Sequence, residues 1–189
     1  MTLEHFYLAC VLWGLTGIGS FILLQFVAAP YGRHIKKGWG PEISNKLGWI
    51  FMEIPSFAII LYFFVVSNQS TYAVMLSVLW LIHYFNRTFI YPFRIRTKGK
   101  KMPLLIVIFA ILFNLVNAST NGYYLAELEQ YTAVSFTTWN FYLGGLLFIF
   151  GFISNQISDT ILIHLRKPGE TGYKIPQGYL FNYISCPNH

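Results

Sequence analysis

The chain contains five long apolar stretches, and this pattern most constrains how it can fold. A bilayer core of about 30 Å takes about 20 apolar residues in a helix to cross it. Each stretch is long enough to do so, and polar breaks that carry most of the Lys and Arg residues separate them. The stretches cover about 5–29, 47–67, 71–93, 103–125 and 136–165. The sequence therefore predicts an all-α, polytopic membrane helix bundle with five transmembrane helices.

The composition also indicates a membrane protein. Of the 189 residues, 55% are hydrophobic and only 11% are charged, whereas soluble domains carry about 25% charged residues. This composition argues against a disordered chain, a collagen-like fibre and an ordinary nucleic-acid-binding domain. No repeat or low-complexity segment divides the chain, so we expect a single domain over residues 1–189. The first stretch reads as a retained helix rather than a cleaved leader, because no basic residue precedes it.

The Lys and Arg residues predict the orientation of the bundle. Twelve of the thirteen lie in alternate breaks, so they would all face one side of the membrane. By the positive-inside rule this side is the cytoplasm, and the amino terminus lies outside. We expect a bacterial inner membrane, or the ER membrane in a eukaryote. The twelve residues are Arg33, Lys36, Lys37, Lys46, Arg94, Arg96, Lys98, Lys100, Lys101, Arg166, Lys167 and Lys174.

Three charged residues lie at or near membrane depth, where ionisable groups are costly and often functional. Glu53 lies in the second stretch, Arg87 late in the third and Asp159 in the fifth. Glu53 comes two residues before Pro55, which frees a backbone carbonyl one turn earlier. Two structural alternatives stay open. Glu53 could be a protonated side chain that bonds a neighbouring helix, and Arg87 could extend to the cytoplasmic surface.

Three sets of polar side chains share a helical face by their spacing. A set of this kind either joins helices or lines a cavity. A cavity with an acid, a phenol, amides and a cationic mouth would suit an anionic cofactor that enters from the cytoplasm. No Rossmann glycine motif, P-loop or metalloprotease motif is present, and the two distant cysteines make no metal site, so no metal is expected. The sets are Tyr84, Arg87 and Tyr91; Asn114, Asn117 and Asn121; and Asn155, Asp159 and Arg166.

Several segments resemble the steroid 5α-reductase family, and the resemblance covers nearly the whole chain. The last two segments given below are its most specific part. The resemblance implies a seven-helix membrane bundle that uses NADPH to reduce the Δ4 double bond of a 3-oxo-Δ4-steroid by hydride transfer to C5. The segments are Glu53-Ile-Pro-Ser-Phe57, His83-Tyr-Phe-Asn-Arg-Thr-Phe-Ile-Tyr91, Asn121-Gly-Tyr-Tyr-Leu125, Leu165-Arg-Lys-Pro-Gly-Glu170 and Tyr173-Lys-Ile-Pro-Gln-Gly178.

The resemblance also implies roles for single residues. Tyr84 and Glu53 would hydrogen-bond the C3 carbonyl of the steroid, on which negative charge develops when hydride adds at C5. A donor of this kind in a dry cavity stabilises the transition state by roughly 3–4 kcal/mol. We expect burial to keep Glu53 neutral, so that it can donate. The residues that match cofactor contacts are Asn155, Asp159, Arg166, Tyr173, Asn188, Arg87, Arg96 and Lys174, the last at a position where arginine is common.

The chain departs from the family pattern in two places. Met52 precedes Glu53 where the animal enzymes often have glutamine, which leaves the identity of the substrate open. The family continues beyond the position of His189 into two more helices, so we expect a reductase domain that lacks its last two helices.

Other functions fit the same residues. A related reductase of enoyl or polyprenoid lipids would use the same donor pair on another carbonyl. A small-molecule transporter would also place charges at membrane depth, but its typical internal repeats are absent from this sequence. A purely structural bundle is the remaining alternative. The expected partners are a steroid or another hydrophobic enone and the lipid bilayer, with no nucleic acid, and we expect a monomer.

Overall fold

The structure, a computed structural model, describes residues 2–27, 39–97, 99–129, 132–166, 170, 172 and 174–188. Tyr173, one of the predicted cofactor residues, lies outside the described residues. All the other predicted site residues are described. Five basic residues used to predict the orientation also lie outside: Arg33, Lys36, Lys37, Lys98 and Lys167.

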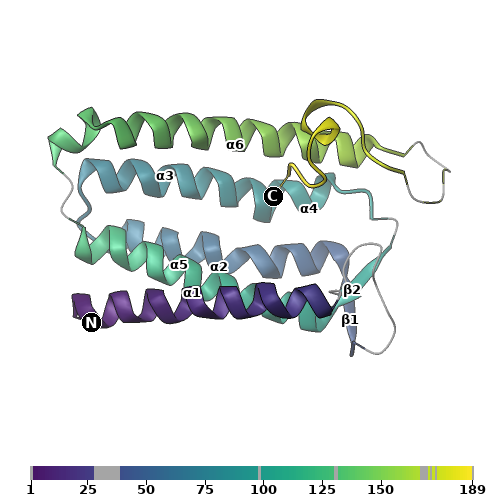
Figure 1. Cartoon of the computed structure of the whole chain (residues 1–189), viewed down its shortest axis with the longest axis horizontal. Coiled ribbons are helices and arrows are strands. Elements are labelled where there is room, and N and C mark those ends of the chain that lie inside the picture. The colour runs from purple at the N-terminus through teal and green to yellow at the C-terminus, as the bar shows by residue number, and fades with distance from the viewer. Residues whose placement is uncertain are drawn as a thin grey trace. The chain divides into compact units, whose positions relative to one another are not determined.

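Six α-helices make up most of the described chain (Figure 1). A π-helical turn, η2 (Asn86–Ile90), joins α3 to α4, and a second, η3 (Tyr124–Leu128), extends α5. Two 3₁₀ turns, η4 (Ala133–Thr137) and η5 (Tyr179–Asn182), lie before and after α6. The helices are α1 (Leu3–Phe26), α2 (Asn45–Val66), α3 (Thr71–Phe85), α4 (Tyr91–Arg94), α5 (Leu104–Tyr123) and α6 (Trp139–His164).

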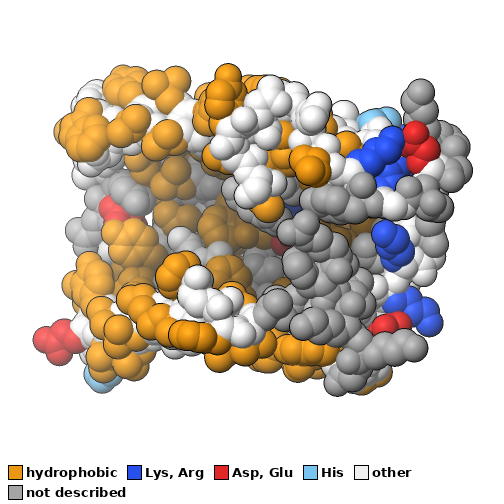
Figure 2. Space-filling model, turned by 45° about the vertical axis from the view of Figure 1, so that its right-hand side comes forward, with side chains coloured by type: hydrophobic (Ala, Val, Ile, Leu, Met, Phe, Trp, Pro, Cys, Tyr) orange, Lys and Arg blue, Asp and Glu red, His pale blue; other side chains and the backbone are white. Residues whose placement is uncertain are grey.

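Five helical segments of the described chain are long and apolar enough to cross a membrane. Each agrees within a few residues with one of the predicted stretches, so the predicted all-α membrane fold is confirmed. The exposed side chains of α1 and α6 are largely hydrophobic, as lipid contact requires (Figure 2). The segments are Leu3–Phe26, Asn45–Val66, Thr71–Arg94, Leu104–Leu128 and Trp139–His164.

A small antiparallel sheet escapes prediction from the sequence. Strand β1 (Glu42–Ser44) pairs with β2 (Lys101–Pro103), with Ile43 opposite Met102. The strands lead directly into α2 and α5, and the Ser44 hydroxyl accepts a hydrogen bond from the first turn of α2. The first and third polar breaks therefore meet at one end of these two helices.

The contacts divide the chain into two compact units, and each is described by itself. Unit 1 comprises Met1–Phe93 and Thr97–Gln130, and unit 2 comprises Arg94–Arg96 and Tyr131–His189. Unit 1 holds α1, α2, α3, α5 and the sheet. Unit 2 holds α6 and the segment that follows it.

The core of unit 1 lies mainly between α2 and α5. Ile60 of α2 and Val107 and Ala118 of α5 are almost completely buried. Gly122 allows the two helices to approach closely, because a Cβ atom there would lie 2.3 Å from Cδ2 of Phe63. Small residues at close helix crossings are typical of membrane bundles, where packing drives helix association.

Replacing Gly122 with valine should destabilise unit 1. The new side chain would overlap the ring of Phe63, and overpacking of this kind costs about 1–3 kcal/mol of unfolding free energy. The midpoint of thermal unfolding in detergent measures the effect. Gly144→Val on α6 is the control, since no atom lies within 4 Å of a Cβ there. Equal midpoints for the two variants would contradict the close approach of α2 and α5.

Candidate active site

Glu53 and Arg87 form a buried ion pair in unit 1. Nε and Nη2 of Arg87 donate to the same carboxylate oxygen, Oε1 of Glu53, at 3.1 and 2.9 Å. The two residues are only 7% and 8% exposed. Charge-assisted hydrogen bonds of this kind are strong where water is excluded. Oε1 of Glu53 is therefore a hydrogen-bond acceptor for Arg87, and the donor role expected for Glu53 toward a substrate stays a prediction.

Two aromatic rings enclose the Arg87 guanidinium. Its Cζ atom lies 4.6 Å from the ring centroid of Trp49 and 5.1 Å from that of Tyr91. The two rings meet edge to face, with their centroids 5.0 Å apart. Cation–π contacts stabilise a guanidinium most where it is desolvated. The alternative in which Arg87 extends to the membrane surface is therefore wrong, since its charge is buried against Glu53.

The backbone around Arg87 departs from the α-helix. In the π-helical turn η2, the N–H of Tyr91 donates to the carbonyl of the residue five positions earlier. A π turn holds more residues than an α turn, so side chains after it point in other directions than α spacing predicts. Tyr84 precedes this turn and stacks on Trp80, whereas Tyr91 follows it and lies against Arg87. Such turns are frequent at functional sites.

Tyr84 lies one turn before Arg87, on α3. Its ring stacks on that of Trp80 with the centroids 5.0 Å apart. The Trp80 indole Nε1 in turn donates to the backbone carbonyl of Ser56 on α2 at 3.1 Å. Through the contacts of Trp80, half-buried Tyr84 lies on the side of α3 that packs against α2, the helix that carries Glu53. Both residues expected to contact the substrate therefore belong to the packed α2–α3 region of unit 1.

The predicted stripe of asparagines on α5 has two separate roles. Nδ2 of Asn114, a buried side chain, donates to the backbone carbonyl of Met52 on α2 at 2.6 Å. Nδ2 of Asn121 donates within its own helix to the carbonyl of Asn117 at 2.8 Å. Of the two alternatives left open by the sequence, these contacts favour helix packing over the wall of a cavity.

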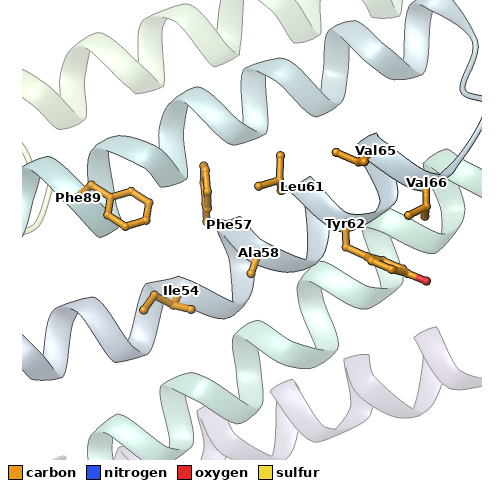
Figure 3. A pocket seen from close by; sticks show the side chains of 8 residues that line it. All are labelled: Ile54, Phe57, Ala58, Leu61, Tyr62, Val65, Val66 and Phe89. Carbon is orange, nitrogen blue, oxygen red and sulfur yellow. The ribbon is translucent and has the colours of Figure 1, made fainter.

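An apolar groove of about 430 Å³ follows α2 in unit 1 (Figure 3). The rings of Phe57 and Phe89 meet edge to face at one end, with their centroids 5.3 Å apart. Ile54 directly follows Glu53 in the chain, so this end lies at the level of the ion pair along α2. From Ile54 to Val66 the helix rises by about 18 Å. The lining residues are Ile54, Phe57, Ala58, Leu61, Tyr62, Val65, Val66 and Phe89.

A second polar cluster lies on α6 in unit 2. The backbone carbonyl of Asn188 accepts a hydrogen bond from Nδ2 of Asn155 at 2.7 Å. Nδ2 of Asn188 donates to Oδ1 of Asp159 at 3.2 Å. Asn155 and Asp159 are both buried, as is Ser158, whose hydroxyl has no hydrogen-bond partner among the described residues. The structure thus brings together three of the predicted cofactor residues: Asn155, Asp159 and Asn188.

The segment after α6 folds back onto this helix through contacts that the sequence did not indicate. The hydroxyls of Ser154 and Tyr179 lie 2.9 Å apart. No charge or motif marks these two residues, and they are separated by 25 positions. Only the return of the chain onto α6 reveals that they meet.

The remaining basic candidates have no described contact with the cluster of Asn155, Asp159 and Asn188. Arg166 is half-buried just beyond the end of α6. Lys174 is exposed and pairs with Glu170 at 2.5 Å, and Arg96 is exposed. Arg94, which was not a candidate, donates to Gln156 and Thr160 of α6 at 3.2 and 2.8 Å. The cofactor roles of Arg166, Lys174 and Arg96 stay predictions.

Comparison with known proteins places the chain in a family. Residues 100–189 match the family model of 3-oxo-5-alpha-steroid 4-dehydrogenase. The chain is 36% identical to the steroid 5-alpha-reductase of Gossypium hirsutum, over 100% of the chain and 74% of that protein. It is 35% identical to 3-oxo-5-alpha-steroid 4-dehydrogenase 1 of Bos taurus, over 97% of the chain and 72% of that protein. The corresponding protein of Homo sapiens is 35% identical over 97% of the chain and 70% of its own length. This chain belongs to the steroid 5-alpha-reductase family of oxidoreductases.

Proposed function

We propose that the chain reduces the Δ4 double bond of 3-oxo-Δ4-steroids with NADPH. Membership of the steroid 5-alpha-reductase family supports the reaction class. The observation that carries the proposal is the buried Glu53–Arg87 ion pair, with Tyr84 one helical turn before Arg87. This arrangement offers a hydrogen-bond donor at membrane depth, where a steroid partitions, without an uncompensated charge beside it.

The proposed chemistry assigns one main task to Tyr84. Reduction at C5 moves an electron pair from the Δ4 bond toward the C3 oxygen, which becomes enolate-like, and C4 then accepts a proton. The Tyr84 hydroxyl donates to the C3 oxygen while this charge develops, and a preorganised donor in a dry site is a major source of rate acceleration. Glu53 lies beside the same carbonyl, and Arg87 balances its charge.

The polar residues of α6 and of the segment after it fit a dinucleotide that, when bound, supplies the hydride. The Asp159 carboxylate accepts hydrogen bonds, and therefore suits the hydroxyl and amide donors of such a cofactor. Asn155 and Asn188 offer both donors and acceptors, and the buried Ser158 hydroxyl has no partner among the described residues. Arg166 and Lys174 supply positive charge for the phosphates. We therefore assign the polar cluster to nicotinamide and ribose groups, and the cations to phosphates.

The test compares two substrates for the purified chain in lipid nanodiscs. NADPH oxidation is followed by absorbance with progesterone, and separately with an enoyl thioester. Progesterone-dependent oxidation, with the 5α-reduced product identified by mass spectrometry, is the expected result. NADPH oxidation with the thioester alone would indicate a lipid enoyl reductase instead. No oxidation with either substrate would contradict a reductase function.

We further propose that the apolar body of the substrate lies in the groove along α2. The groove begins at the level of Glu53, and its lining is almost entirely hydrocarbon, with three aromatic rings. A rigid apolar molecule whose carbonyl lies at Tyr84 would leave its rings to pack against such a wall. Burial of its surface there would supply binding free energy of about 25 cal/mol per Å².

Filling the groove should therefore weaken substrate binding. Ala58 lies in the groove wall, and Ala58→Phe would occupy space that the substrate needs. We expect KM for progesterone to rise about tenfold, because contacts in an apolar pocket discriminate at this level, with NADPH affinity unchanged. Leu112→Phe is the control, at an exposed position on α5 outside the groove. If both variants keep the wild-type KM, the groove faces lipid alone.

We propose that the basic breaks face the cytoplasm, as the distribution of Lys and Arg predicts. Support comes from the sheet, which joins the first and third breaks at one end of unit 1. Cysteines introduced at exposed Lys46 and, as a contrast, at exposed Glu127 test the proposal by labelling intact cells with a membrane-impermeant thiol reagent. We expect labelling at Glu127 and protection at Lys46. The reverse result would invert the orientation.

A further inference from the structure

The ion pair engages Arg87 in a way that differs from the cofactor role implied by the family resemblance. Nε and Nη2 both donate to one oxygen of Glu53, while Trp49 and Tyr91 lie against the guanidinium. A guanidinium that holds a phosphate needs its forked N–H donors directed at that phosphate. Two of these donors are directed at Glu53 instead. These contacts therefore pair Arg87 with Glu53, a residue that is proposed to lie beside the substrate.

Each of the two helical segments that form the ion pair also contributes one aromatic ring. Trp49 lies one turn before Glu53 on α2, and Tyr91 lies one turn after Arg87 at the end of the π-helical turn. The two rings also contact each other, so each helix contributes one charge and one ring to the same cluster. This packing restricts where the guanidinium can lie, and through its two hydrogen bonds it restricts the Glu53 carboxylate.

The positive charge of Arg87 compensates the negative charge of Glu53. A lone carboxylate beside the C3 oxygen would repel the negative charge that develops there, and burial would strengthen the repulsion. With Arg87 paired to it, the cluster carries no net charge. Both hydrogen bonds from Arg87 reach Oε1, so they fix the orientation of the Glu53 carboxylate.

We infer that Arg87 is a positioning residue for the proposed reaction: it neutralises Glu53 and fixes its carboxylate beside Tyr84, and it does not hold the cofactor. The inference rests on the proposed function for its consequence in turnover. The ion pair itself, and the coupling between its two members, can be measured without any substrate.

The test is a double-mutant cycle of Arg87→Met, Glu53→Gln and the double variant. Arg87→Met leaves a carboxylate without its partner, and we expect kcat with progesterone to fall by roughly 100-fold, while the Kd for NADPH stays unchanged. Adding Glu53→Gln removes that carboxylate, so the double variant should be more active than Arg87→Met. Such non-additivity is the signature of two residues that act as a unit.

Two further variants sharpen the comparison. Arg87→Lys keeps the charge but not the paired N–H donors, and should therefore retain an intermediate kcat. It also replaces Arg87→Met in the cycle should that variant fail to fold. Lys46→Met is the matched control, since exposed Lys46 also lies over an aromatic ring, 5.4 Å from that of Phe93, but lies about two helical turns before Glu53 on α2. It should behave as wild type.

Separate outcomes would overturn the inference and the proposed function. Additive losses of kcat in the cycle, or weaker NADPH binding in Arg87→Met and not in Glu53→Gln, would overturn the inference. If the wild-type chain reduces no steroid, the proposed function fails, and the same four proteins still report on the pair through their thermal unfolding midpoints. Midpoints that shift additively would then contradict any coupling between Arg87 and Glu53.

Discussion

Replacing Tyr84 with phenylalanine is expected to remove most steroid turnover and leave the Kd for NADPH unchanged. The substitution removes one hydroxyl and keeps the ring, so the stacking on Trp80 persists. Loss of one preorganised donor to a developing oxyanion typically lowers kcat by about 10²–10³-fold. The effect should fall on kcat more than on KM, because the hydrogen bond strengthens as charge moves onto the C3 oxygen.

Steady-state kinetics with progesterone and a separate NADPH-binding titration test this expectation. Tyr142→Phe is the control, since this tyrosine is 59% exposed on α6 and should lose no activity. A Tyr84→Phe protein with near-wild-type kcat would exclude the donor role and leave Glu53 to be explained in another way. Loss of NADPH binding along with turnover would instead indicate a wider structural effect.

The helices of this fold could be predicted closely because their cause is local. A stretch of about 20 apolar residues satisfies the bilayer on its own, and the end of α3–α4 at Arg94 and the start of α5 at Leu104 follow directly. The sheet could not be predicted, since each strand has three residues within a polar break. Its pairing of Ile43 with Met102 depends on a fold that brings distant breaks together.

The candidate site was predictable in its members but not in its pairings. Their positions within apolar stretches marked Glu53 and Arg87 as unusual, and helical spacing placed Tyr84 near Arg87 on one helix. Spacing on a single helix says nothing about which face of α2 meets it, so the ion pair was invisible in the sequence. The π-helical turn η2 also changes the direction in which the side chains after it point, and regular α-helical spacing does not predict this change.

In unit 2, too, the sequence does not reveal contacts between residues that are far apart in the chain. Asn155 and Asp159 share a face of α6 because they are four residues apart. Asn188 joins them only because the segment after α6 folds back, and its contacts bridge 33 and 29 positions. The family resemblance named Asn188, whereas no physical pattern in the residues around it did.

Replacing Asp159 with alanine should strongly weaken NADPH binding. Asp159 is 1% exposed and accepts a hydrogen bond from the Asn188 side chain. The variant would remove one acceptor from the proposed cofactor site and release Asn188, whose carbonyl orients Asn155. Loss of a hydrogen bond to a charged group costs about 1.5–3 kcal/mol, which corresponds to a Kd raised by roughly 10- to 100-fold.

Two variants separate direct binding of the cofactor by Asp159 from support of Asn188. Asp159→Asn keeps an oxygen that can accept from Asn188 but loses the charge, so a Kd near wild type would assign Asp159 to positioning alone. Ser154 lies on the same helix as Asp159. Ser154→Ala removes the contact with Tyr179, leaves Asp159 in place, and should leave the Kd for NADPH unchanged. Wild-type NADPH affinity in Asp159→Ala would contradict the proposed site on α6. Turnover by Asp159→Ala that recovers at saturating NADPH would show that the proposed role of Tyr84 does not depend on Asp159, because the substitution would then affect cofactor binding alone.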